Sequence, residues 1–433
     1  MACYPQRGIN RKLRNSINSY ILQSLSTLTW PKGPSFLYLN KQKKSLQNHV
    51  LFTLATCLPQ KDSKMFSTAT ELDLNHLLTN DIWPEDQCIP PACLTQDSAK
   101  KLIERIDTVP IFAHTYPFYF NFHFETMHPQ DVMDFAYING LSGCSLYVYD
   151  GGPLSLAAMT KKEREAFGAY AVSLGLTVFL ETSDTGKNAI DEVVVVARDV
   201  GAKTIRAYSR YEGKLSSVLE QIRRDLAYMG EIAERFDLNF DFEQHEDLKA
   251  IEIADLLREN GSKRCNAVFD FTNMINAYET PINAMRDMAP YIRQVHVTGG
   301  KRVYEPQGWA QKAVILGTEE DQIPAIRLFY ELLMLGGTKQ QVLAFILEQE
   351  DGYYAPPFRG PNDTIDPFIP YRSPSETPLP DGISRERLAL NERRYAQDMI
   401  RQVREILGRL RTATVLWLNS EKHELKNTSI NTA

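Results

Sequence analysis

The sequence contains no apolar run as long as the ~20 residues that a membrane-spanning helix requires. Cysteine is scarce as well: there are six in 433 residues, and only Cys88 and Cys93 lie close together in the chain. Scattered cysteines favour free thiols in a reducing compartment over a disulfide framework. These two absences exclude a helical membrane protein and a small disulfide-rich secreted domain, and the remaining composition is that of a globular protein.

Acidic residues are nearly absent from residues 1–64, which carry ten Lys or Arg and only Asp62. The net charge of the whole chain is −6, so removing the +9 of this leader leaves −15 for residues 65–433. A basic leader rich in Ser and Leu is typical of a mitochondrial transit peptide. A translated stretch upstream of Met65 explains the same composition. We therefore expect a cytoplasmic protein, with a mitochondrial one as the alternative.

Short apolar runs that end in polar residues alternate with stretches of helical period after residue 110. The eight strand candidates are 111–118, 143–150, 176–183, 204–211, 238–245, 265–272, 292–299 and 342–349, and the helix candidates between and after them are 160–174, 189–199, 216–236, 248–259, 281–290, 322–335 and 385–410. This alternation predicts a parallel α/β sheet. A count of eight favours a closed (β/α)₈ (TIM) barrel over the alternative, an open doubly wound sheet.

The predicted domain organisation places a cap segment at 65–107, the barrel at 108–410 and a C-terminal tail at 411–433. Two excursions interrupt the barrel pattern. Residues 299–321 are predicted as a long loop after the seventh strand, and residues 350–383 as a longer excursion after the eighth. Long excursions of this kind are usually functional or disordered. Because the second is rich in Pro and aromatic residues, we expect a packed lid or an arm that contacts another subunit of a homo-oligomer.

Four consecutive strand candidates end in an ionisable residue: Glu243, Asp270, His296 and Glu348. Because side chains alternate along a strand and the apolar neighbours of these residues face the helices, the four ionisable side chains are expected to face the barrel interior. The carboxyl ends of barrel strands meet at one face, where active sites lie. Three carboxylates and an imidazole gathered there would repel and be costly to desolvate without a divalent cation. This ligand set suits Mn²⁺, Mg²⁺ or Co²⁺, with Zn²⁺ as a further candidate. Glu350 has the parity of Glu348, but Glu348 ends the apolar run directly.

The same alternation predicts that Arg206 and Tyr208, on the fourth strand candidate, also face the barrel interior. Arg206 has two interpretations. It pairs with Asp241 on the next strand, or it binds a carboxylate or phosphate of the substrate with bidentate geometry. The second interpretation would favour a lyase that acts on an acidic sugar.

Three further polar residues are weaker candidates for substrate contacts. His114 ends the first strand candidate, Glu181 ends the third, and His245 follows Glu243 by two positions. The alternative for each is a local hydrogen bond within the fold, the commoner role of such residues.

The segment FEQHEDLKAIEIADLL (242–257) and the segment from CNAVFDFTN to QVHV (265–297) resemble the xylose-isomerase-like barrel superfamily. That superfamily includes sugar epimerases, inosose dehydratases and endonuclease IV enzymes. The resemblance covers roughly residues 110–350. It implies that the four inward residues are the metal ligands, and that Glu243 and Glu348 are also the acid and base beside the substrate.

The resemblance also implies substrate contacts for Asn273, in the turn after the sixth strand, and for Arg302, in the first excursion. Two departures stand out. Phe271 and Thr272 replace the usual Thr-Gly, and Thr298 and Gly299 replace the usual Lys-Asp. The surroundings of the metal are therefore expected to differ from those of a typical epimerase.

The function these features predict is a metal-dependent isomerase or epimerase that acts on a small keto sugar through an enediolate. The alternative is a metal-dependent lyase, a decarboxylase or dehydratase, for example of a 3-oxo sugar acid, because the same enediolate forms there. A nuclease like the apurinic endonucleases of the superfamily is less favoured, since a domain of charge −15 is a poor polyanion binder. A barrel that binds a ligand without catalysis is also less favoured, because the predicted ligand set is complete.

Overall fold

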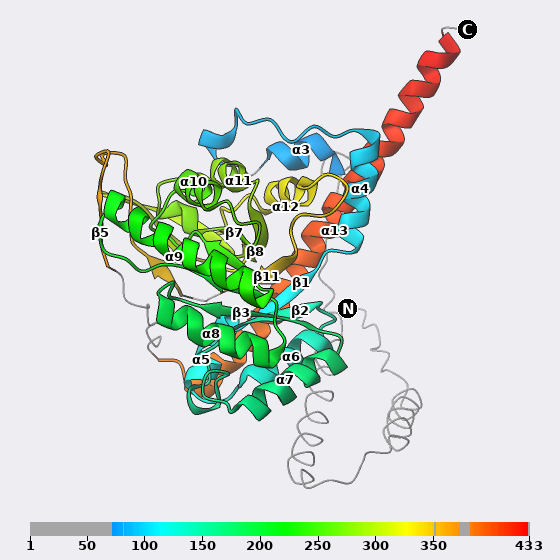
Figure 1. Cartoon of the computed structure of the whole chain (residues 1–433). Coiled ribbons are helices and arrows are strands. Elements are labelled where there is room, and N and C mark those ends of the chain that lie inside the picture. The colour runs from blue at the N-terminus through cyan, green and yellow to red at the C-terminus, as the bar shows by residue number, and fades with distance from the viewer. Residues whose placement is uncertain (1–71, 81, 350–351, 372–381, 432–433) are drawn as a thin grey trace, which may run out of the picture. The chain divides into compact units, whose positions relative to one another are not determined.

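A computed structural model describes residues 72–80, 82–349, 352–371 and 382–431 (Figure 1). The predictions for the leader 1–64 and for Glu350 lie outside these residues. Eight parallel strands close into a barrel in which β1 pairs with both β2 and β11. The strands are β1 (Ile111–His114), β2 (Gly143–Tyr147), β3 (Thr177–Thr182), β4 (Thr204–Ala207), β6 (Asn239–Glu243), β7 (Cys265–Asp270), β8 (Ile292–Val297) and β11 (Ala344–Leu347). The predicted (β/α)₈ barrel is confirmed.

Side chains alternate between the two faces of the barrel wall, as β6 illustrates. Phe240 and Phe242 are buried in the apolar core that the strands share with the helices. Asp241 and Glu243 alternate with them and point into the barrel, where each contacts side chains of other strands. The same alternation on β7 and β8 places Asp270 and His296 side by side in register.

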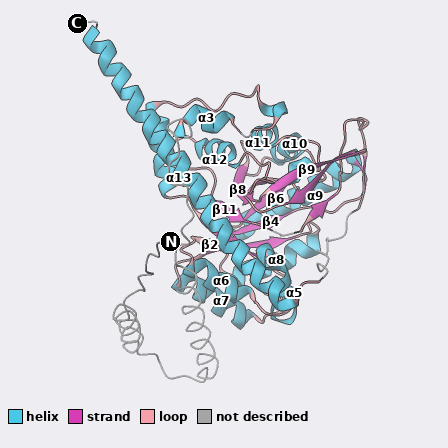
Figure 2. Ribbon diagram, turned by 180° about the vertical axis from the view of Figure 1, so that it is seen from behind, coloured by secondary structure: helices cyan, strands magenta, loops and turns pink. Residues whose placement is uncertain are grey.

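Helices surround the strands in both views (Figures 1 and 2). They are α3 (Leu74–Thr79), α4 (Gln96–Asp107), α5 (Tyr119–His123), α6 (Pro129–Ile138), α7 (Lys161–Ser173), α8 (Lys187–Val200), α9 (Leu215–Phe236), α10 (Ala250–Asn260), α11 (Pro281–Met288), α12 (Ala325–Met334) and α13 (Arg385–Asn431). Short 3₁₀ turns lie at η2 (Pro84–Asp86), η3 (Tyr116–Phe118), η4 (Gly152–Leu154) and η5 (Asn273–Ile275). None of the described helices is both long and apolar enough to cross a membrane.

Local signals in the sequence set several helix ends. Thr160 begins α7 with a capping box, in which its hydroxyl accepts the Glu163 N–H and the Glu163 carboxylate accepts the Thr160 N–H. Gly201 ends α8 in the left-handed conformation, at a φ of 83°. Such signals at both ends explain why the predicted helices lie close to the observed ones.

The first excursion is a hairpin rather than the predicted long loop. Strands β9 (Gly300–Glu305) and β10 (Gly308–Ala313) pair in antiparallel fashion, and β12 (Tyr354–Ala355) adds to β10. The prediction failed because these strands are polar and lack an apolar alternation. Pro306 and Gln307 form the turn between them. Gly308 is required for packing, since a Cβ there would lie 2.3 Å from the carbonyl oxygen of Arg359.

The described part of the second excursion, residues 352–371, packs onto the carboxyl face of the barrel; we call it the strap. Its strand β13 (Phe368–Ile369) pairs with β5 (Gly213–Lys214). The side chain of Asn276 donates to the carbonyl oxygens of Ala355 and Pro356, both at 2.8 Å. A lid or a subunit contact remains a prediction for this segment.

Helix α13 was predicted to end at residue 410 but continues to Asn431, so the predicted tail is helical through that residue. It packs against α4, α5 and α12 and runs past β11 (Figure 2). Leu410 and Ala413 are buried, so the apolar face continues beyond the predicted end. That continuing face explains the longer helix.

Candidate metal site

The structure brings the four predicted ligands together at the carboxyl end of the barrel. Glu243, Asp270 and His296 lie on β6, β7 and β8, and Glu348 directly follows β11. One ligand atom from each residue lies within 4.8 Å of the ligand atoms of the other three. We call these four residues the cluster. Its convergence follows from parallel neighbouring strands that all end at one face.

Two contacts bring His296 onto the carboxylates. Its Nδ1 lies 3.2 Å from Glu243 Oε1 and also contacts Glu348 Oε2. Both His296 Nδ1 and Glu348 Oε2 are buried atoms without a hydrogen bond to any residue that the structure describes. Two buried polar atoms that lie close together without a hydrogen bond are arranged as two ligands of one cation would be. The donor set is mainly oxygen, which suits a hard divalent cation.

Four donors fix the orientation of Asp270. Its Oδ1 accepts the N–H groups of Thr272 and Asn273, each at 2.7 Å, and the Thr272 hydroxyl at 2.8 Å. Its Oδ2 accepts the Thr298 hydroxyl at 2.9 Å. The two threonines that depart from the superfamily pattern are therefore the residues that hold this carboxylate.

The electrostatics of the cluster reflect burial and crowding. Burial raises the pKa of Asp270 to about 6, and the charges of Glu348 and Glu243 add to the increase. Burial would lower the pKa of His296, but the same two carboxylates outweigh it and raise that pKa well above its usual value. Burial would raise the pKa of Glu243, but Arg206 and His296 outweigh it and hold that pKa low. The carboxylates thus depend on nearby positive charge.

Arg206 supplies part of that charge. Its guanidinium pairs with Glu243, and its Nη1 lies 3.4 Å from Glu181 Oε2. The predicted alternative, a pair with Asp241, is wrong: Asp241 accepts a hydrogen bond from Gln294 at 2.5 Å instead. The reason is reach, since the long Arg206 side chain extends past its strand neighbour Asp241 to the next inward position of β6.

Tyr208, His245 and Asn273, three of the predicted substrate contacts, lie next to Glu243. Asn273 Nδ2 is 3.3 Å from Glu243 Oε1 and 3.4 Å from His245 Nδ1. The rings of Tyr208 and His245 have centroids 3.8 Å apart. The guanidinium of Arg210, which sequence reasoning missed, lies 4.8 Å from the Tyr208 ring centroid. Its inward position two residues after Tyr208 was the available signal.

His114 and Glu181 lie behind the cluster. Glu181 Oε1 is 2.8 Å from His114 Nε2 and 3.8 Å from His296 Nε2. The hydroxyl of Ser145, which sequence reasoning also missed, donates to the same oxygen at 2.5 Å. All of these side chains are fully buried, so the structure places the two predicted contacts inside the barrel.

Arg302 is not brought to the cluster. Its guanidinium lies 4.1 Å and 4.2 Å from the ring centroids of Trp83 and Trp309, and it pairs with Glu85 at 2.9 Å. The predicted substrate contact of Arg302 is wrong because the residue lies in the paired strand β9 rather than in a loop, and its side chain contacts the cap segment. Its charge is engaged there.

The strap and the hairpin contribute contacts near the cluster that the sequence did not reveal. The hydroxyl of Tyr353 donates to Glu246, and Gln311 Nε2 lies 3.4 Å from Asn273 Oδ1. Nothing in the local pattern marks either residue, because their position depends on how the excursions fold back over the barrel.

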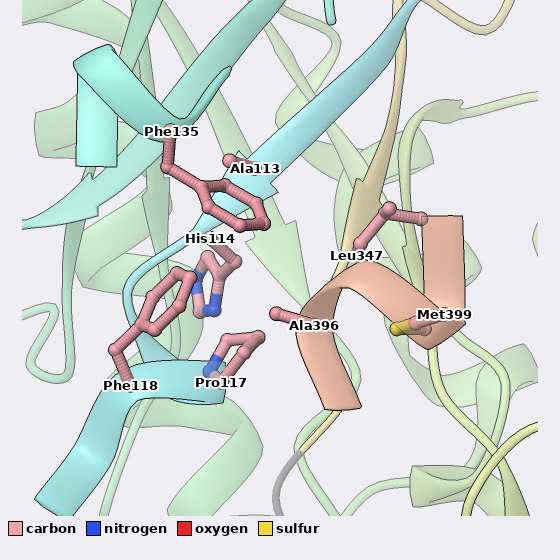
Figure 3. Close-up of a pocket in the computed structure, with 8 residues that line it drawn as sticks. All are labelled: Ala113, His114, Pro117, Phe118, Phe135, Leu347, Ala396 and Met399. Atoms are coloured by element: carbon pink, nitrogen blue, oxygen red, sulfur yellow. The ribbon is translucent and has the colours of Figure 1, made fainter. Parts of the chain in front are cut away.

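A small apolar cavity of about 10 Å³ lies beside His114, between β1 and α13 (Figure 3). Its lining residues are Ala113, His114, Pro117, Phe118, Phe135, Leu347, Ala396 and Met399. A volume of this size holds about one water molecule, so this cavity is not a sugar site.

Comparison with known proteins shows a relative over most of the chain. No protein-family model matches the chain. YihM, an uncharacterized protein of Escherichia coli strain K12, is 41% identical over 318 residues, which cover 73% of this chain and 97% of YihM.

Among solved structures, a xylose isomerase domain protein from Planctomyces limnophilus is similar at 16% identity and a TM-score of 0.44, over 56% of this chain and 91% of that one. The IolI protein with a bound zinc atom is similar at 10% identity and a TM-score of 0.47, over 69% and 98%. A D-psicose 3-epimerase studied with D-fructose is similar at 10% identity and a TM-score of 0.43, over 55% and 85%. Likenesses of this size do not bear on the activity of this chain.

Proposed function

Because the chain belongs to the family of Escherichia coli YihM and folds as a xylose-isomerase-like barrel, we propose that it is a metal-dependent isomerase or epimerase of a small keto sugar. The observation that carries the proposal is the cluster: three carboxylates and one imidazole, with ligand atoms within 4.8 Å of one another at the carboxyl face of the barrel. Active sites of such barrels lie at this face.

Glu243, Asp270, His296 and Glu348 would hold the cation. The donor set is mainly oxygen, which favours Mn²⁺, Mg²⁺ or Co²⁺, with Zn²⁺ as a further candidate. A divalent cation there would supply Lewis acidity toward a substrate carbonyl oxygen.

Glu243 and Glu348 are proposed as the two proton-transfer groups. An isomerase must remove a proton from the carbon beside a carbonyl and return one at another position, which needs a base and an acid in reach of the substrate. Arg206 keeps Glu243 ionised, as a base requires. The side chain of Glu348 is 14% exposed and is the most accessible of the four.

A neutral sugar fits the charges better than a sugar acid. Arg206, which could bind a substrate carboxylate, is already paired with Glu243 and Glu181. Tyr208, His245 and Asn273 offer the hydrogen-bonding groups that sugar hydroxyls need. The lyase acting on a sugar acid therefore ranks second, and the nuclease and the non-catalytic barrel rank below it.

The experiment is a screen with the purified, metal-loaded protein. Keto sugars and sugar acids are incubated with it, and products are separated and weighed by mass spectrometry. An isomerase yields a product of unchanged mass, while a lyase yields one lighter by a CO₂ or a water. A protein that retains no divalent metal after purification and binds none on addition would overturn the proposal.

We also propose that the protein acts in the cytoplasm. Its relative YihM is bacterial, so the activity of the family does not require mitochondrial import. Fluorescent fusions of the full chain and of residues 65–433, expressed in a eukaryotic cell, test this. Mitochondrial fluorescence that depends on residues 1–64 would contradict it.

A further inference from the structure

We propose that Glu181, held by His114 and Ser145, is a positioning residue that fixes the ring of His296 so that Nδ1 faces the cluster. The inference rests on the proposed metal site. Sequence reasoning placed Glu181 and His114 among the substrate contacts, and the structure favours a different role because both are buried behind the ligand.

The two nitrogens of His296 face different partners. Nδ1 lies among the cluster carboxylates, 3.2 Å from Glu243 Oε1, while Nε2 lies 3.8 Å from Glu181 Oε1. A neutral imidazole that gives its Nδ1 lone pair to a cation carries its proton on Nε2. The 3.8 Å separation is longer than a hydrogen bond, and His296 Nε2 has no hydrogen-bond partner among the described residues, so Glu181 acts through its charge. A carboxylate on the Nε2 side favours the tautomer that carries its proton there.

A chain of hydrogen bonds fixes Glu181 in turn. The backbone N–H of Tyr116 donates to His114 Nδ1 at 3.2 Å, which assigns the His114 proton to Nε2. That Nε2 then donates to Glu181 Oε1 at 2.8 Å, and Ser145 donates to the same oxygen at 2.5 Å. The backbone after β1 thereby determines the proton of His114 and holds Glu181 in place, 3.8 Å from His296 Nε2.

The neighbours of Glu181 disfavour a direct contact with substrate, because Oε1 already accepts hydrogen bonds from His114 and Ser145. The Glu181 side chain is fully buried, and its other oxygen lies 3.4 Å from Arg206 Nη1. His114, Glu181 and His296 also satisfy the spacing of a second cation site. That arrangement would require His114 to give up the proton it donates to Glu181, beside the positive charge of Arg206, and we therefore favour positioning.

The test uses Glu181→Gln, which keeps the shape of the side chain and removes its charge. Asp241→Asn is the matched control, because Asp241 is another buried carboxylate of the barrel interior and bonds to Gln294 rather than to the cluster. Metal-free proteins are titrated with Co²⁺ and followed by visible absorption. We expect wild type and Asp241→Asn to bind one Co²⁺ with equal affinity, and Glu181→Gln to bind about 10–100-fold more weakly.

A second readout reports the tautomer directly. In the Co²⁺ protein, the exchangeable Nε2 proton of a coordinated histidine gives a strongly shifted NMR signal. It should be present and slowly exchanging in wild type and Asp241→Asn, and lost or rapidly exchanging in Glu181→Gln. Should Glu181→Gln fail to fold, Ser145→Ala removes one donor to Glu181, and the same signal should then shift and exchange faster.

The outcomes separate this inference from the proposed function. Equal Co²⁺ affinity and an unchanged proton signal in Glu181→Gln would overturn the positioning role and leave the metal site standing. Two bound Co²⁺ ions per wild-type chain, of which His114→Ala loses one, would make His114 and Glu181 ligands and overturn it as well. A wild-type protein that binds no Co²⁺ would overturn both.

Discussion

Arg206 and Glu243 form an ion pair across the neighbouring strands β4 and β6, and each side chain is 1% exposed. A pair so fully removed from water is costly to build, but removing one partner is more costly still because it leaves an uncompensated buried charge. The cluster is thus connected to the stability of the barrel through one arginine. The effect of replacing Arg206 on the free energy of unfolding can be measured without knowing the substrate.

Replacing Arg206 with Met should lower the free energy of unfolding by about 3–5 kcal/mol, because Glu243 and Glu181 lose their common cation. Urea denaturation of the metal-free protein measures this change. The control is Arg223→Met, since Arg223 pairs with Glu220 and Glu259 on the surface, and it should cost less than about 1 kcal/mol. Similar losses in the two variants would contradict the role given to Arg206.

Asp270→Ala and His296→Ala should each release the metal, because each removes one of four converging ligands. The metal content of purified protein, measured by plasma mass spectrometry, checks this. Metal-loaded wild type should also unfold at a higher temperature than the metal-free form. Its free energy of unfolding should rise by about 2.7 kcal/mol when free metal is 100-fold above its Kd. Full metal occupancy in both variants would refute the site.

Glu348→Gln should retain metal but lower kcat by about 10²–10⁴-fold, because the amide can still offer an oxygen ligand but cannot transfer the proton. Turnover of the substrate found in the screen is measured at saturating metal, with Asp241→Asn as a control that keeps its rate. Unchanged kcat in Glu348→Gln would remove this residue from the proton-transfer pair.

Glu279 should make the stability of the fold pH-dependent. Burial raises its pKa from 4.5 to about 7, although its carboxylate accepts hydrogen bonds from the Ala250 N–H and the Gln244 side chain. The folded protein therefore holds the proton more tightly than the unfolded chain. The contribution of Glu279 is intact below pH 4.5 and is lost as the pH rises through about 7.

Glu279→Gln should abolish that loss, since the amide oxygen can accept both hydrogen bonds without a charge. The variant should gain stability relative to wild type between pH 5 and pH 8, by on the order of 1–3 kcal/mol. Urea denaturation at both pH values measures the difference. A difference that stays constant over this range would show that Glu279 does not titrate there.

The sequence predicted the cluster because a strand has a strict period of two, so each ligand is fixed to the inward face once the strand is found. It did not predict how deep a side chain lies along the barrel axis. Glu181 has the same inward parity as Glu243, yet it lies behind His296 rather than at the mouth. The depth of a side chain depends on the stagger of all eight strands, and the sequence of one strand does not determine that stagger.

Contacts made by long side chains and by excursions were equally hard to predict. Arg206 passes its strand neighbour Asp241, and Arg302 contacts the rings of two tryptophans that are far apart in sequence. Both outcomes depend on tertiary packing. Helices with clear caps and an apolar face were predicted well, because their signals are local.

The hydrogen bonds of Asp270 limit how many bonds it can make to a cation. Oδ1 already accepts three donors, from Thr272 and Asn273, whereas Oδ2 accepts a single donor among the described residues, the Thr298 hydroxyl. A carboxylate oxygen has about two lone pairs, so only Oδ2 has one to spare. Asp270 is therefore restricted to monodentate ligation, which disfavours Ca²⁺, an ion that often takes both oxygens of a carboxylate, relative to Mg²⁺ or Mn²⁺.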